Sequence, residues 1–448
     1  MSIIVGIVVG TAIFKTPMMV FQNTAGVWQA MGVWLVGGVL SLCGAFCYAE
    51  LATTYPRDGG DYEYLSRSFG RPIGFLFGWA QLAVVLSASI GQMAYAFADY
   101  AAAIWPAAAS QAASLAVAAI VALAMLNAGG VVAGKNTQNL LTAAKVLGLG
   151  GVVLAGLWAG KSVGHSPTAA PSSGNASLGL AMVFVLYAYG GWNDAAFVAA
   201  EVRDQRRNLP RALWIGIFAI TIIYLVVNVV YLRVLGFDLA RESSAPAADV
   251  VASAFGPSGR AAASVLVMLS ALAAINGMIL AGSRVYAVVG ADYPRARWLA
   301  TWNRQAAVPL AAILVQALVA VSLVLAVGTS TGKSLLDAGL TRVGIGGLPW
   351  DEYFGGFETL VAGSAPVFWA FFLLTGLAVF VLRWKDPDTE RPFSIPGYPL
   401  PPLVFCATSL YMLYSSLAYA RWLALLGIVP LALGVPLWWV ARRSVGKS

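Results

Sequence analysis

Charged residues are scarce in this sequence: they make up 10% of the 448 residues, whereas hydrophobic residues make up 60%. Soluble domains carry about 25% charged residues, so a water-soluble protein is excluded. The apolar residues form long blocks, and a hydrocarbon core is crossed by about 20 residues of helix. The blocks do not alternate as the strands of a membrane barrel do. We therefore expect an all-α integral membrane protein.

Histidine and cysteine are nearly absent. With His165 as the only histidine, a zinc or haem site of the usual kind is not expected, and we predict no metal and no cofactor. Cys43 and Cys47 share a helix face inside an apolar block, where packing is a simpler role than metal binding, and Cys406 lies in another block. None of the three is expected to face outward, so the sequence indicates no disulfide-linked glycoprotein partner.

The N-terminus lacks both a basic segment and a small-residue cleavage site, so the first apolar block is expected to stay in the mature protein.

The net charge of +8 could suggest a protein that binds nucleic acid, but arginine and lysine collect at the ends of the apolar blocks, where they set membrane topology. If the N-terminus lies in the cytoplasm, seventeen of the 27 arginines and lysines fall on the inner side and seven on the outer side. We therefore expect both termini in the cytoplasm.

Polar segments divide the apolar blocks into twelve expected membrane helices. They lie at residues 3–23, 28–52, 73–99, 112–130, 138–159, 176–199, 211–236, 260–289, 308–328, 358–382, 400–419 and 422–440.

Two of these spans are interrupted by small residues near their centres. The first contains Gly6 and Gly10, and the sixth contains the run Tyr187-Ala188-Tyr189-Gly190-Gly191-Trp192-Asn193. Glycines in membrane helices also serve close helix packing, which is the simpler interpretation of a lone Gly6–Gly10 pair. Paired interruptions in corresponding halves, however, are typical of a transporter's binding site. Spacing alone leaves both interpretations open.

An interrupted membrane helix has backbone N–H and C=O groups without partners, which is tolerated only where the break lines a polar cavity. N–H groups at the start of a half-helix attract an anion, and C=O groups at the end of one attract a cation. Two adjacent breaks would bind a zwitterion such as a free amino acid. The groups expected to do so are the N–H groups of Thr11, Ala12 and Ile13 for the carboxylate and the carbonyls of Val8, Tyr187 and Ala188 for the ammonium.

Motifs along nearly the whole chain resemble those of the amino acid–polyamine–organocation (APC) superfamily of permeases. In the first half they are Gly10-Thr11-Ala12-Ile13-Phe14 with Pro17, and Ala49-Glu50-Leu51-Ala52-Thr53-Thr54-Tyr55-Pro56 followed by Gly59-Gly60-Asp61-Tyr62. The run at residues 187–193, with Glu201 and Arg207-Asn208-Leu209-Pro210, resembles the sixth helix of L-type amino acid transporters and their bacterial relatives. Further matches are Asn276-Gly277, Gly282-Ser283-Arg284 and Arg391-Pro392-Phe393.

The resemblance implies a LeuT-type fold with discontinuous helices one and six. Residues 1–159 would form the first inverted repeat of five spans and residues 160–382 the second, with a long outer loop at about 328–354 for which no function is evident. Residues 383–448 would carry the last two spans and a cytoplasmic tail. The expected location is the cytoplasmic membrane of a bacterium.

The resemblance also implies roles for individual residues. Tyr187 matches an aromatic outer gate above the substrate, and Gly190 matches a break glycine beside the substrate side chain. Ala12 departs from the usual glycine, so the backbone approach there is expected to be tighter. The full predicted substrate-binding set is Val8, Gly10, Thr11, Ala12, Tyr187, Ala188, Gly190 and Asn193.

Lys145 lies in the middle of an apolar span, where a charge costs about 2.5–3.5 kcal/mol on the insertion scale. It matches a fifth-helix lysine that, in relatives, faces the first helix where sodium-coupled members hold an ion. Two interpretations remain open: a structural amine that ties two helices together, or a group whose protonation couples to transport.

Other charged residues near the breaks also have two interpretations. Lys15 could extend outward along the helix or line the outer vestibule, and Asp194 could pair with a neighbouring helix or with a cationic substrate group. At the cytoplasmic end, an ion-pair network that forms an inner gate is expected from Arg57, Asp58, Glu201 and Arg203.

The function expected from these features is secondary active transport of amino acids by alternating access, with neutral L-amino acids moved by exchange. The alternatives are a proton-coupled symporter that uses Lys145 and an amino acid sensor built on the same fold. A membrane-embedded enzyme would need acidic pairs or histidines at a membrane face, and here the acidic residues mostly neighbour arginines in loops.

Overall fold

The computed structural model describes residues 12–57, 59–160, 177–193, 204–303, 305–342, 344, 346–348, 350 and 355–442. Within these residues the chain is helical, with no strand and one isolated bridge between Asn303 and Val308. The predicted residues Val8, Gly10, Thr11, Asp58, Glu201 and Arg203, together with His165 and Asp194, lie outside the described ranges.

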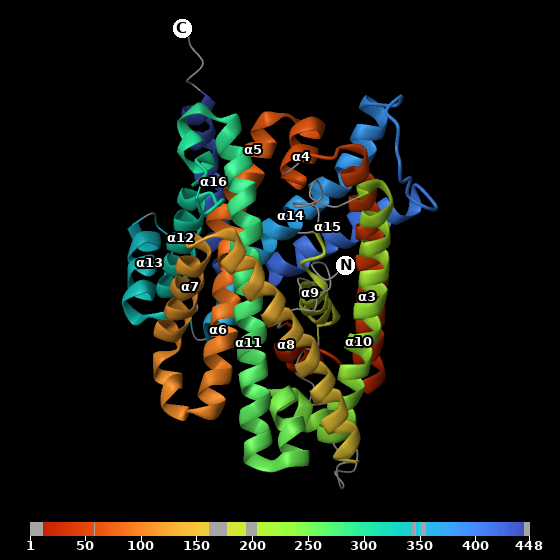
Figure 1. Ribbon diagram of the computed structural model, residues 1–448, viewed down its shortest axis with the longest axis vertical. Coiled ribbons are helices and arrows are strands. Elements are labelled where there is room, and N and C mark those ends of the chain that lie inside the picture. The colour runs from red at the N-terminus through yellow and green to blue at the C-terminus, as the bar shows by residue number, and fades with distance from the viewer. Residues whose placement is uncertain are drawn as a thin grey trace.

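The helices follow one another along the chain as expected from the apolar blocks (Figure 1). Their bounds are α2 (Ala12–Gln22), α3 (Val27–Thr54), α4 (Asp61–Phe69), α5 (Arg71–Ala80), the π-helical turn η1 (Gln81–Val85), α6 (Leu86–Ile104), η2 (Pro106–Gln111), α7 (Ala112–Ala128), α8 (Val131–Trp158), α9 (Leu178–Tyr189), α10 (Gln205–Glu242), α11 (Pro246–Asp292), η4 (Pro294–Ala300), α12 (Leu310–Gly328), α13 (Ser330–Arg342), α14 (Gly355–Lys385), α15 (Leu400–Ala420), η6 (Arg421–Ala424) and α16 (Leu425–Arg442).

Nine helical stretches of the described chain are long and apolar enough to cross a membrane. One of them, Leu400–Arg442, contains two of the expected spans. The chain breaks between them at Arg421, whose φ of 46° is left-handed. Many large apolar side chains on these helices point outward, such as Leu147 and Leu154 on α8, which are 75% and 68% exposed. An apolar exterior of this kind suits contact with lipid.

Two sets of helices pack side by side. One set, the α9 group, consists of α2, α3, α9 and α10, which contact one another. The other, the α11 group, consists of α6, α7, α8, α11 and α12, all of which contact α11. In Figure 1, α3 and α10 lie at one edge of the view and α7 and α12 at the opposite edge. Helix α14 packs against α6 and α12 of the α11 group and against α3 of the α9 group, and so borders both groups.

The structure differs from the apolar pattern in three segments: one expected loop contains a helix, and two helices are interrupted by a glycine. The outer segment expected as a loop at about 328–354 contains helix α13, in which Asp337 accepts hydrogen bonds from Leu348 N at 2.9 Å and from Trp350 Nε1 at 2.8 Å. Helices α10 and α11 each include a non-helical glycine, Gly236 with φ 76° and Gly256 with φ 64°. These positions mark the ends of the spans expected at 211–236 and 260–289, because a left-handed residue interrupts a helix and is easiest for glycine.

Candidate functional site

The sixth expected span leaves helical geometry where its paired glycines stand. Helix α9 ends at Tyr189, Gly190 has φ −59° and ψ 165°, and Gly191 has φ 97°. Gly190 N donates to Tyr187 O at 3.0 Å, and the Ala188 carbonyl accepts a hydrogen bond from Tyr224 Oη at 2.8 Å. Helix α9 packs directly against α2.

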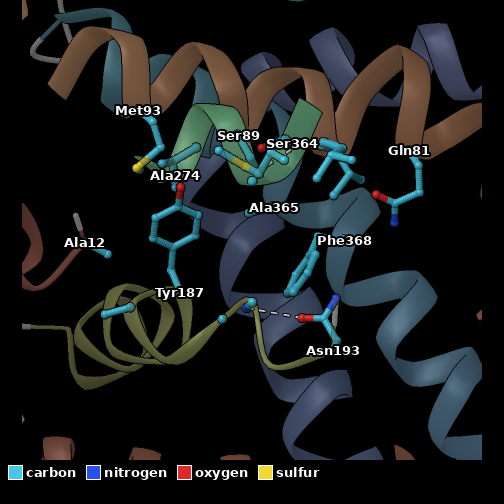
Figure 2. A pocket seen from close by; sticks show the side chains of 18 of the residues that line it. Ala12, Gln81, Ser89, Met93, Tyr187, Asn193, Ala274, Ser364, Ala365 and Phe368 are labelled. Atoms are coloured by element: carbon cyan, nitrogen blue, oxygen red, sulfur yellow. Dashed lines mark hydrogen bonds between the residues drawn. The ribbon is translucent and has the colours of Figure 1, made fainter. Parts of the chain in front are cut away.

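A cavity of about 140 Å³ lies next to this break. A cavity of about 10–15 Å³ is enough for one water molecule. This cavity is several times larger and has room for a small organic molecule. Its wall comes from α2, η1, α6, α8, α9 with the following turn, α11 and α14, and therefore from both helix groups. Figure 2 shows the cavity extending from Ala12 and Met93 at one end to Gln81 and Asn193 at the other.

Every described member of the predicted substrate-binding set borders this cavity. The residues are Ala12, Tyr187, Ala188, Gly190 and Asn193. Ala12, the first described residue of α2, is 6% exposed. The Asn193 carboxamide folds back over the break, and its Oδ1 accepts from Gly191 N at 3.2 Å. The sequence thus anticipated a set of residues that share one cavity, and their binding roles remain predictions.

Tyr187 reaches across the cavity from α9 toward α6 and α14. Its hydroxyl donates to Gln92 Oε1, Gln92 Nε2 donates to Ser364 Oγ at 3.2 Å, and Ser364 Oγ donates to Leu360 O at 2.7 Å. The ring also makes an edge contact with Phe357, with the centroids 6.2 Å apart. A chain of hydrogen bonds that ends on a backbone carbonyl fixes the phenol in one orientation.

The wall of the cavity that faces the break was not identified from the sequence. It includes Gln81, Ser89 and Met93 from the third span, Gln138 from α8, Ala273, Ala274, Gly277 and Met278 from α11, and Ser364, Phe368 and Trp369 from α14. Which side chain of an apolar helix faces a cavity depends on how that helix packs, and only the Asn276-Gly277 motif gave any signal here.

Lys145 is fully buried within α8, with 1% of its surface exposed. It is not among the residues that line the cavity. Helix α8 packs against α11, α10 and α7. Both interpretations of this lysine, structural tie and proton coupling, therefore remain predictions.

One interpretation of Lys15 was that its side chain extends outward along the helix, and the structure does not show this. It is 6% exposed, and its Nζ lies 2.7 Å from Asp99 Oδ2 at the end of α6. Glu358, in the first turn of α14, interacts electrostatically with the same amine. Burial of an ammonium is tolerated when a carboxylate pairs with it, and this partner lies 84 positions away along the chain.

A second ion pair joins α3 and α14 beyond the other end of the cavity. Glu50, whose side chain is 4% exposed, accepts from Arg383 Nε at 2.8 Å and from Arg383 Nη2 at 2.6 Å. It also accepts from Ile395 N at 2.9 Å. The predicted inner-gate residue Arg57 lies in the same region and pairs with Glu63 at 3.4 Å. The sequence did not single out Glu50 or Arg383 as a pair.

Asp61, at the start of α4, forms a third polar contact in this region. Its Oδ1 accepts from Tyr48 Oη at 2.5 Å and from Thr375 Oγ1 at 2.6 Å. Desolvation of the buried carboxyl raises the pKa of Asp61 to about 6, although both hydrogen bonds oppose the shift. Tyr48 also packs edge-on against Trp192 in the break, with centroids 5.0 Å apart. The carboxyl of α4 is therefore linked, through Tyr48, to the helix break beside the cavity.

These features define a polytopic membrane protein whose helices enclose a small-molecule cavity at a helix break. The sequence profile described as amino acid permease matches residues 1–439, and the chain belongs to this family of the APC superfamily. It is therefore a transport protein, integral to the membrane, and not an enzyme.

The chain is similar to several characterised transporters over most of its length. It is 30% identical to the human b(0,+)-type amino acid transporter 1, covering 88% of this chain and 77% of that protein. It is 27% identical to the serine/threonine exchanger SteT of Bacillus subtilis, covering 93% and 89%. It is 28% identical to the human large neutral amino acids transporter small subunit 2, covering 98% and 78%.

Proposed function

We propose that this chain is a secondary active transporter that exchanges neutral L-amino acids across the cytoplasmic membrane of a bacterium by alternating access. The observation that carries the proposal is the cavity bordered both by Ala12 of α2 and by Tyr187, Ala188 and Gly190, where α9 ends. The names of the relatives support the substrate class, since they describe amino acid transporters and, for the bacterial protein, an exchanger.

Helix contacts support a LeuT-type inverted repeat of residues 1–159 and 160–382. If the twelve expected spans are numbered in order, α2 packs against α9, α3 against α10, α6 against α11 and α7 against α12. Each of these pairs joins span n to span n+5, which is the arrangement that two interlocked five-helix repeats would produce. We place both termini in the cytoplasm, on the basis of the distribution of arginine and lysine.

The lining of the cavity favours an uncharged substrate side chain. The side chains that border it include carboxamides, hydroxyls, aromatic rings and a thioether, but no carboxylate, ammonium or guanidinium among the described lining residues. A charged substrate side chain would lose its hydration there without an opposite charge to replace it. Neutral amino acids would incur no such cost.

The two charged ends of the amino acid would be held by backbone groups. N–H groups at the start of α2, those of Thr11, Ala12 and Ile13, would bind the carboxylate, because a helix N-terminus carries partial positive charge. Carbonyls of Val8, Tyr187 and Ala188 would bind the ammonium. The Ala188 carbonyl already accepts from Tyr224, and its second lone pair is the one that would be available.

Two ion pairs would close the cavity alternately. Lys15 with Asp99 lies on the side that we assign as outer, and Glu50 with Arg383 on the side that we assign as inner. Arg57 and Glu63, with the predicted Asp58, Glu201 and Arg203, would add to the inner closure. In alternating access one closure must loosen while the other holds.

Uptake of radiolabelled amino acids into proteoliposomes tests this function. We expect uptake of a neutral amino acid only when the vesicles contain a neutral amino acid. Uptake into empty vesicles that rises with an inward proton gradient would instead favour symport, with Lys145→Gln expected to abolish the response. Binding detected by thermal shift without any flux would indicate a sensor.

A further inference from the structure

Two buried carboxamides and one half-buried carboxamide form a hydrogen-bonded chain that ends at the cavity. Asn127 of α7 donates through Nδ2 to Asn276 Oδ1 of α11 at 2.7 Å. Asn276 donates through Nδ2 to Gln138 Oε1 of α8 at 2.9 Å. Asn127 and Asn276 are 0% exposed, whereas Gln138 borders the cavity. The chain thus runs from the interior of the α11 group to the proposed substrate site.

Two backbone carbonyls set the direction of this chain. Asn127 Nδ2 also donates to Leu123 O at 2.8 Å, and Asn276 Nδ2 also donates to Gly134 O at 3.1 Å. Turning either carboxamide over would place its oxygen against a carbonyl oxygen, and a carbonyl only accepts hydrogen bonds. Both acceptors therefore demand the same orientation, in which the oxygen of Gln138 is occupied by Asn276.

In this orientation the side-chain amide NH2 of Gln138 remains available as a hydrogen-bond donor. Its Nε2 lies beside Gly277, close enough that a Cβ at Gly277 would be 3.4 Å away, and Gly277 also borders the cavity. No acceptor for Nε2 is found among the described residues. Gln81, another carboxamide at the cavity, is 6% exposed, and its side chain likewise has no partner within the described part of the chain. Gln81 is buried and Gln138 is half-buried at the cavity wall. Buried polar groups are normally hydrogen-bonded, so these two side chains at one cavity point to a ligand with polar atoms.

We propose that Gln138 determines substrate specificity: its N–H groups donate to an oxygen on the substrate side chain, and Asn127 and Asn276 are positioning residues that fix the direction of this donation. The inference rests on the proposed transport function and narrows it. The favoured substrates are neutral amino acids whose side chain carries a hydroxyl or a carbonyl oxygen. An aliphatic side chain of the same shape would leave the Gln138 donor without an acceptor, and sites built for a hydrogen bond discriminate against such analogues.

Exchange in proteoliposomes with two pairs of isosteric substrates tests the proposal. Threonine is compared with valine, and asparagine with leucine, each by the ratio of kcat/KM. The unaltered protein is expected to favour the polar member at least about tenfold, the effect of one unsatisfied buried donor. Gln138→Met, which keeps the length of the side chain without polar atoms, is expected to bring both ratios close to one while valine and leucine exchange continues.

A second variant tests the positioning role. Asn127 does not border the cavity, yet Asn127→Leu is expected to lower the threonine-to-valine ratio, because Asn276 and Gln138 are then free to turn. Asn228→Leu is the matched control, since Asn228 is also 0% exposed and, among the described residues, donates only to Tyr224 O in its own helix. That variant is expected to keep the ratio of the unaltered protein even if its thermal stability falls.

Two results would overturn the proposal: no preference for the polar member in the unaltered protein, or a preference that Gln138→Met leaves within twofold of its original value. If Gln138→Met lowers the ratio and Asn127→Leu does not, the positioning role of Asn127 is wrong. Absence of exchange for all four amino acids in the unaltered protein would count against the transport function itself, which keeps the two failures distinct.

Discussion

Lys15 Nζ lies 2.7 Å from Asp99 Oδ2, and this ion pair joins the first helix that lines the cavity to the end of α6. The lysine is almost fully buried, whereas the aspartate side chain is 39% exposed. The pair therefore bridges the interior and one mouth of the bundle. Helices α2 and α6 belong to different helix groups, so a relative movement of the groups would have to break it.

The Lys15–Asp99 pair is expected to couple the two groups energetically. Lys15→Met and Asp99→Asn should each lower the thermal stability of the purified protein, and the double variant should lose less than the sum of the two. Pairs in direct contact give interaction energies of about 0.5–3 kcal/mol in such cycles. Strict additivity of the two single variants would contradict a closed pair.

The Glu50–Arg383 pair is expected to contribute far more to stability than an exposed pair of the same kind. Loss of a partner from a buried ion pair costs up to about 3–5 kcal/mol. Without Arg383, the buried Glu50 carboxylate would keep only the more distant Arg391, whose Nε lies 3.6 Å from Oε1, so Arg383→Gln should lower the unfolding midpoint strongly. The control is Arg206→Gln, because Arg206 and Glu390 are 65% and 75% exposed and exposed pairs contribute about 0–1 kcal/mol. Equal losses in the two variants would show that burial of Glu50 does not matter.

The stability of the protein is expected to depend on pH through Asp61. Because the pKa of Asp61 is raised to about 6 in the folded state, the folded protein binds this proton more tightly than the unfolded chain. The contribution to stability is therefore fully present below about pH 4, the range of an ordinary aspartate, and is lost as the pH rises through 6. The free energy of unfolding is expected to fall by about 3 kcal/mol over this pH range.

Asp61→Asn isolates this effect, since the amide keeps an acceptor for Tyr48 and Thr375 and carries no titratable proton. Thermal unfolding should show the variant gaining stability relative to the unaltered protein between pH 5 and pH 7.5. A constant difference across this range would contradict the raised pKa.

Two glycines of α8 are expected to respond oppositely to substitution by alanine. A Cβ at Gly134 would clash with Asn127 Oδ1, whereas Gly150 has no neighbour within 4 Å. Gly134→Ala should therefore disrupt the carboxamide chain, lower stability and reduce the threonine-to-valine ratio. Gly150→Ala should leave transport unchanged and stabilise the helix by about 0.5–1 kcal/mol. Similar behaviour of the two variants would argue against the close contact at Gly134.

The all-helical membrane architecture could be predicted from the sequence because membrane helices carry their own signal. The apolar blocks are longer than the apolar runs of helices in the core of a soluble protein. The break at Gly190 could be predicted because Gly190-Gly191 interrupts such a block near its centre. Residues next to the break, such as Tyr187 and Asn193, could therefore be placed at the cavity from the local sequence together with the family resemblance.

Contacts between distant helices could not be predicted in the same way. The partner of Lys15 is Asp99 and the partner of Glu50 is Arg383, in each case a residue more than eighty positions away. The carboxamide chain from Asn127 to Gln138 likewise depends on how three helices pack. One helix has many polar and small residues, and only the packing decides which of them face a shared cavity.

The central claim is that a free amino acid occupies the cavity beside the break at Gly190, and the protection of a thiol placed there tests it most directly. In a protein whose Cys43, Cys47 and Cys406 are replaced by alanine, Ala365→Cys places a thiol on the cavity wall, and Ser110→Cys places one on an exposed turn. We predict that the exchanged amino acid slows modification of the thiol at position 365 by a methanethiosulfonate reagent, with half-protection at the concentration that half-saturates exchange. Modification at position 110 should not change. Equal rates at position 365 with and without a saturating amino acid would contradict the account.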